Sequence, residues 1–187
     1  MMPRIAVGDR LVYLGNYLGI GPMQFETVAE LLRFRRLFLS IPPYMDAGDV
    51  IFLRGAQEEM WQKLLQLQFS VRPREILEWM IAKGVEATLA AYGGRAADGF
   101  LRAREGPVAL TSWTSELRAA ARAAPGHDAL MSSLKRAAMS HEKGVLFVSS
   151  GIDITQPLKK QADSFWWAGR SFAGITRPFE SFRRVVR

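Results

Sequence analysis

Cysteine is absent from this sequence of 187 residues, and histidine occurs only twice. The lack of cysteine excludes disulfide bonds, thiolate zinc sites and cysteine nucleophiles. No apolar run approaches the roughly 20 residues that a membrane-spanning helix requires, and residues 1–7 lack the long apolar stretch of a secretory signal. We therefore expect a cytoplasmic protein without a membrane span.

The sequence contains fewer acidic than basic residues. The chain has 25 Lys and Arg against 18 Asp and Glu, a formal net charge of +7, which can attract nucleic acid, anionic lipid or an acidic partner. The basic residues are scattered except at the C-terminus, so a solvated surface is favoured over a nucleic-acid site. The segment from Arg177 to Arg187 is either a basic binding tail or, over residues 183–186, a strand. We favour the strand.

Three short apolar runs predict strands: Leu11–Leu14, Val50–Leu53 and Val145–Val148. None alternates apolar with polar residues, a pattern typical of strands that are buried on both faces in a parallel sheet. Turn-forming segments follow these runs at residues 15–16, 54–55 and 149–151. Ligands bind at the carboxyl ends of strands in such sheets, so these turns are the candidate site.

Between the predicted strands, apolar residues recur with the spacing of an amphipathic helix. It begins near Phe25, near Met60 and near Ser115, and the last pattern predicts one or two helices before Ala138. The segment from Gly93 to Pro107 is rich in Gly, Arg and Ala and is expected to be a surface connection. Strands that alternate with helices indicate an α/β layered fold. The length and the 49% hydrophobic content fit one domain over residues 1–187.

Four segments together resemble the calcineurin-like metallophosphoesterases. Residues 8–22 (GDRLVYLGNYLGIGP) are similar to the family motif G-D-x-x-V-x-x-G-D-x-V-D-R-G-P, and residues 52–60 (FLRGAQEEM) to F-L-R-G-N-H-E-x-M. Residues 84–93 (GVEATLAAYG) resemble the G-G-x-x-T-x-x-S-Y-G segment of the bacterial branch, and residues 146–152 (LFVSSGI) resemble L-F-V-H-A-G-I. That branch includes bacterial serine/threonine phosphatases and diadenosine tetraphosphate hydrolases. The resemblance implies a truncated metallophosphoesterase-like fold, with a central, mostly buried β-sheet flanked by helices.

The family hydrolyses phosphate esters with two divalent metals, such as manganese or iron, which activate a water and clamp the phosphoryl oxygens. According to the resemblance, the residues of this sequence that correspond to the family's metal ligands are neutral. The positions that correspond to the family's site are Asn16, Gly19, Ile20, Arg54, Ala56, Gln57, Glu58 and Ser149. Only Glu58 keeps a carboxylate, and support of the structure or a charge at a helix N-terminus is its expected role. We therefore predict no catalytic residue, no metal and no cofactor.

Two further family motifs, the N-terminal G-D-x-H-G and the C-terminal G-H-T, have no counterpart in this sequence. Missing outer strands would leave open sheet edges and apolar surface, which favour pairing with another chain. We therefore expect a pseudo-phosphatase that acts by protein binding or oligomerisation, as a scaffold or regulatory subunit. The alternatives are a residual metal-dependent hydrolase of phosphoproteins or dinucleoside polyphosphates, a basic nucleic-acid-binding module, and an inert product of a degenerate gene. The two histidines, His127 and His141, are expected at the surface near helix ends.

Overall fold

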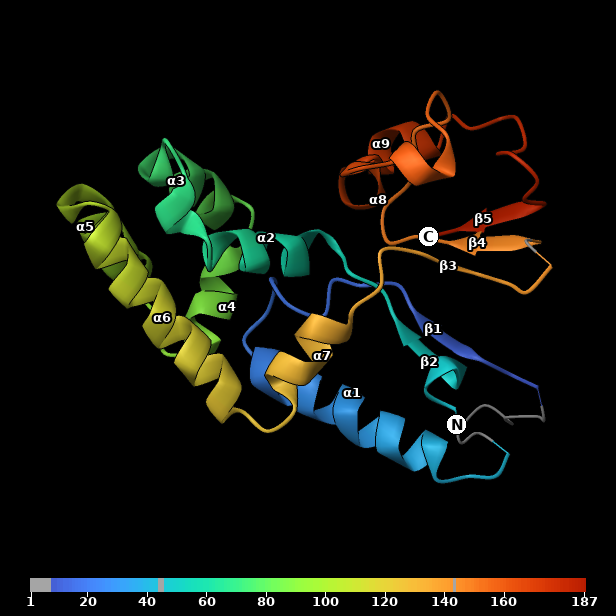
Figure 1. Ribbon diagram of the computed structural model, residues 1–187, viewed down its shortest axis with the longest axis horizontal. Coiled ribbons are helices and arrows are strands. Elements are labelled where there is room, and N and C mark those ends of the chain that lie inside the picture. Colours follow the sequence, from blue (N-terminus) through green and yellow to red (C-terminus); the bar gives the residue numbers. More distant parts are fainter. Residues whose placement is uncertain (1–7, 44–45, 143) are drawn as a thin grey trace. The chain divides into compact units, whose positions relative to one another are not determined.

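The computed structural model describes residues 8–43, 46–142 and 144–187 (Figure 1). The N-terminal stretch considered above for a secretory signal lies outside these residues. The chain forms two compact units. The first, called the strand unit, comprises residues up to Gly15, Leu31–Gly55 and Ser133–Arg187, and the second, the helical unit, comprises Asn16–Glu30 and Ala56–Ser132. The prediction of a single domain stays a prediction.

The strand unit contains two small sheets. Strands β1 (Leu11–Tyr13) and β2 (Val50–Phe52) pair in parallel. In the other sheet, β4 (Val145–Phe147) pairs antiparallel with β3 (Ala138–Met139) and parallel with β5 (Arg184–Val186). Figure 1 shows β4 between β3 and β5. The three strands predicted from apolar runs are confirmed, and so is the strand predicted near the C-terminus.

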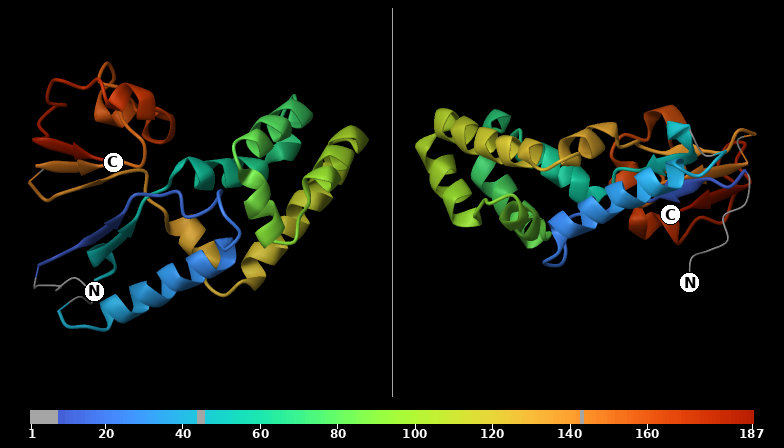
Figure 2. Two further views of the ribbon diagram at one scale, coloured as in Figure 1. Left: turned by 180° about the vertical axis from the view of Figure 1, so that it is seen from behind. Right: turned by 90° about the horizontal axis from the view of Figure 1, so that it is seen from below.

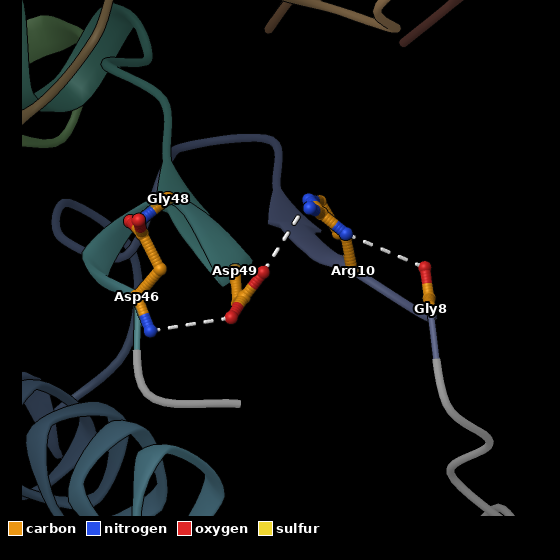
Figure 3. Close-up of polar contacts among 5 residues, drawn as sticks. All are labelled: Gly8, Arg10, Asp46, Gly48 and Asp49. Carbon is orange, nitrogen blue, oxygen red and sulfur yellow. Dashed lines mark hydrogen bonds and ion pairs between the residues drawn. The ribbon is translucent and has the colours of Figure 1, made fainter. Parts of the chain in front are cut away.

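A polar cluster fixes the entry into β1 and β2. Asp49 ends a short 3-10 helix, η1 (Ala47–Asp49), directly before β2, and its carboxylate lies 3.4 Å from Nε of Arg10, which precedes β1. Asp46 caps η1: its Oδ1 accepts the Gly48 N–H at 2.7 Å, and its own N–H donates to Asp49. Figure 3 shows these contacts. Asp49 is buried, so this ion pair and capping box help to bring the two strand starts together.

The expected central, mostly buried sheet is not found within the described residues. All residues of β1 are half-buried, and only Leu146 is fully buried in β4. The strands are two or three residues long, too short to form one broad layer that helices cover on both faces. The chain is instead a mixed α/β protein that is mostly helical.

Helices make up the helical unit. They are α2 (Ala56–Leu64), α3 (Pro73–Ala82), α4 (Val85–Ala91), α5 (Ala96–Glu105), α6 (Pro107–Ala123) and α7 (His127–Ser133), with a 3-10 turn η2 (Leu67–Phe69) before α3. Helix α1 (Gln24–Leu39) contributes residues to both units. The strand unit holds the short helices α8 (Ser164–Trp167), α9 (Gly169–Phe172) and η3 (Leu158–Lys160). Within the described part of the chain, no helix has both the length and the apolar composition needed to cross a bilayer.

Helix α5 corrects the expectation of a surface connection between Gly93 and Pro107. It packs against α6, and the right-hand view in Figure 2 shows the two helices next to each other. Gly99 allows this approach, because a Cβ there would lie 2.6 Å from Cη2 of Trp113. Gly99, which in the sequence favours a loop, therefore lies in the middle of a helix and allows close helix packing.

Candidate functional site

The strand ends that the sequence singled out do meet in the strand unit. A Cβ added at Gly15, which follows β1, would lie 2.6 Å from the backbone nitrogen of Gly55 and 2.8 Å from Oγ of Ser149. Arg54 is half-buried, and its backbone N–H donates to the carbonyl of Lys135 at 2.7 Å. The turns after β1, β2 and β4 thus approach one another, although β4 belongs to a different sheet from β1 and β2.

Glu58 organises the candidate site in the helical unit. It is the third residue of α2, and only 1% of its surface is exposed. Its carboxylate accepts three backbone N–H groups of the segment after Gly15: Asn16 at 2.8 Å, Tyr17 at 2.7 Å and Leu18 at 3.0 Å. Hydrogen bonds from backbone amides are the usual compensation for a buried carboxylate. Glu58 therefore ties residues 16–18 to the start of α2.

Asn16 completes this connection in the opposite direction. Its Oδ1 accepts the backbone N–H of Gln57 at 3.2 Å, which satisfies one of the amides that the first turn of α2 leaves without a helical partner. Asn16 has a φ of +59°, a left-handed conformation that asparagine tolerates better than most residues. The Asn16 side chain thus caps the start of α2.

The rest of the loop is held by two glutamines. Gln24 is 3% exposed; its Oε1 accepts the Gly19 N–H at 2.7 Å and its Nε2 donates to the Gly21 carbonyl at 2.8 Å. Nε2 of Gln57 donates to the Lys83 carbonyl at 2.9 Å. Gly19, with a φ of +106°, lies so close to Gln57 that a Cβ would be 2.2 Å from its Cδ. We call residues 16–21 with these partners the anchored loop.

The structure separates the predicted site positions into groups. Asn16, Gly19, Gln57 and Glu58 are brought together in the anchored loop and at its partner helix. Of the remaining positions, Ile20 is 88% exposed, Ala56 is the half-buried first residue of α2, and Arg54 and Ser149 belong to the strand unit. Gln24 was not predicted from the sequence. Its role is to hydrogen-bond the loop that folds back onto it, and no sequence motif marks such a glutamine.

A pair of divalent metals does not fit this set of side chains. Hard cations require several carboxylate or imidazole ligands, and the carboxylate oxygens of Glu58 already accept three amide hydrogens. Oδ1 of Asn16 is used by α2, which leaves Oε1 of Gln57 as a buried amide oxygen without a hydrogen-bond partner among the described residues. Within the same residues, no group of three or more His, Asp or Glu side chains could hold a metal ion.

His127 corrects the expectation that both histidines lie at the surface. It is 1% exposed at the first position of α7, with Nδ1 3.0 Å from Oη of Tyr92 and its ring 4.4 Å from that of Phe25. Burial lowers the pKa of His127 from its ordinary value and raises the pKa of Tyr92 to about 12. His141 is exposed. His127 is therefore a core residue of the helical unit.

Comparison with known proteins gives no assignment. No family model, curated protein or solved structure matches this chain.

Proposed function

We propose that this chain is a non-catalytic relative of the calcineurin-like metallophosphoesterases, with a truncated form of their layered fold, and that it works by binding protein. The observation that carries the first part is the use of Glu58. This carboxylate, the only one kept at the positions that resemble the family's site, accepts three loop amides. A site that serves a phosphatase through metals serves here as an internal support.

Exposed apolar side chains on the helical unit support the second part. Phe69, the last residue of η2, is 81% exposed, and Val71, in the connection to α3, is 96% exposed. Ile76 and Trp79 on α3 are 37% and 44% exposed. We call these four residues the η2–α3 surface. Because η2 and α3 contact each other, this apolar group lies on one connected part of the molecule. Large exposed apolar groups of this kind are typical of protein interfaces.

The partner is another protein chain, either a second copy of this chain or a larger protein. Sedimentation velocity over a range of concentrations tests self-association, and binding to immobilised wild-type chain provides a second measurement. Val71→Asp is expected to weaken association by placing a charge in the interface. Val108→Asp is the matched control, since Val108 is 86% exposed on α6 and lies outside the η2–α3 surface. A chain that stays monomeric and binds no protein would overturn the proposal, and equal effects of both substitutions would overturn the assignment of this surface.

The alternative, a residual metal-dependent phosphoesterase, is favoured by no contact among the described residues of the anchored loop. It requires ligands that the described residues of the helical unit do not offer together. The cytoplasmic location stays a prediction from the sequence.

A further inference from the structure

The positive charge of the chain is concentrated in its last 31 residues. Residues 157–187 contain seven Lys and Arg and two Asp and Glu, a net charge of +5 out of the +7 of the whole chain. This segment belongs entirely to the strand unit. The rest of the chain is nearly balanced, so the segment from residue 157 onward is the strongly basic part of the molecule.

A pocket of about 330 Å³ lies within this segment. Three arginines, Arg177, Arg183 and Arg184, line it together with the phenylalanines Phe172, Phe179 and Phe182. We call these six residues the arginine pocket. Its volume is in the range of pockets that hold small organic groups.

The backbone of the arginine pocket is fixed by the fold. Arg184 begins β5, and the N–H groups of Arg183 and Arg184 both donate to the Gly144 carbonyl, at 3.0 and 3.1 Å. The rings of Phe179 and Phe182 are buried and stack at 6.4 Å, and the Phe182 N–H donates to the Phe179 carbonyl at 3.0 Å. The strand at the C-terminus, as favoured from the sequence, thus positions the arginines of this pocket.

The arginines of this pocket differ in their partners from three arginines of the helical unit. In the helical unit, Arg72, Arg95 and Arg102 each pair with a carboxylate three residues later. Among the described residues, no carboxylate forms an ion pair with Arg177, Arg183 or Arg184, and all three are exposed. The guanidinium groups are therefore available to an external anion.

We propose that the arginine pocket binds single-stranded nucleic acid, with its guanidinium groups on the phosphates of an unpaired segment. Guanidinium groups bind phosphate through paired hydrogen bonds. The concave shape suits a single nucleotide better than a flat lipid surface, and the wall contains an aromatic ring, Phe172, with Arg187 stacked over it at 4.8 Å. Aromatic and arginine planes are the usual platforms for unpaired bases. This activity uses the strand unit and is independent of the η2–α3 surface.

Fluorescence anisotropy with a labelled oligouridine tests the proposal on the full chain. Three phosphate contacts predict a slope of log K against log salt of about −2, since each contact on a single strand contributes about −0.7. Affinity should then fall about 20-fold between about 50 and 200 mM salt. The triple variant Arg177→Ala, Arg183→Ala, Arg184→Ala should lose most of this binding and of its salt dependence. Replacing the same residues by lysine should keep the salt dependence.

The control carries the same change in net charge on the other unit. Arg74, Arg104 and Arg122 are exposed on helices of the helical unit, and their replacement by alanine should leave binding within about twofold of wild type. Equal losses in both triple variants would show attraction by net charge alone and would overturn the site. Absence of oligouridine binding, with binding to phosphatidylserine vesicles or to an acidic peptide instead, would overturn the assignment to nucleic acid. Circular dichroism of each variant separates these outcomes from unfolding.

Discussion

The anchored loop depends on Glu58, and Glu58→Gln is the substitution that tests this most sharply. Glutamine has nearly the same size and shape, so packing inside the helical unit is preserved. It replaces one carboxylate oxygen by an NH₂ group, which cannot accept a hydrogen bond. At least one of the amides of Asn16, Tyr17 and Leu18 would then face another donor.

The expected cost follows from these hydrogen bonds. Losing one bond to a charged acceptor costs about 2 kcal/mol, and weakening the other two from charged to neutral acceptors costs about 1 kcal/mol each. Removing a buried charge returns about 1–2 kcal/mol, because the folded state no longer desolvates it. The free energy of unfolding of the helical unit should therefore fall by about 2–3 kcal/mol, which shifts the urea midpoint by about 1 M.

Urea unfolding followed by circular dichroism measures the total effect, and hydrogen exchange of the amides of Tyr17 and Leu18 measures it locally. Glu78→Gln serves as the control, because Glu78 is exposed on α3, and it should change stability by less than about 0.5 kcal/mol. The reasoning is refuted if both substitutions have the same small effect, or if the Tyr17 and Leu18 amides exchange no faster in Glu58→Gln than in wild type.

Further predictions concern packing and pH. Gly19→Ala should lower the free energy of unfolding by about 2 kcal/mol more than Gly21→Ala does. Both glycines have φ near +105°, but only Gly19 contacts Gln57, so the difference between the two urea midpoints measures the clash apart from the backbone strain. Equal midpoints would contradict the loop geometry. Burial lowers the pKa of His127 below 6.5, so the unfolded chain takes up a proton first and stability should fall as pH drops below about 6.5. The variant His127→Asn should lack this part of the slope, and an unchanged pH profile would show that the ring is solvated. Ionisation of Tyr92 in the folded state should occur near pH 12, and an ultraviolet titration that finds its ordinary value of 10 would contradict burial against His127.

Much of the secondary structure was predictable, because it depends on local patterns. The apolar runs marked β1, β2 and β4 within one residue at their ends. Helix α5 was missed because Gly99 is a poor helix former in isolation, and only its contact with Trp113 explains it. The arrangement into two small sheets was also beyond the sequence, since an apolar run shows that a strand forms but not how much of it is covered.

The candidate site was predictable in position but not in its contacts. The turn after the first strand identified Asn16, and the resemblance to the metallophosphoesterase motifs identified Gln57 and Glu58. The cap from Asn16 to Gln57 and the three amides on Glu58 join residues about 40 positions apart, which no local pattern encodes. His127 carried no sequence signal for burial, because histidine is common both at surfaces and in cores.

Metal binding and phosphatase activity, measured on one preparation, test the central claim most directly. The protein is dialysed against manganese, its metal content is determined, and hydrolysis of a generic phosphomonoester is followed with manganese present. The neutral positions Asn16 and Gln57 and the engaged carboxylate of Glu58 predict no stoichiometric metal and no turnover. Stoichiometric metal together with turnover that Glu58→Gln abolishes would contradict the account, because the carboxylate would then be a ligand and not the anchor of its loop.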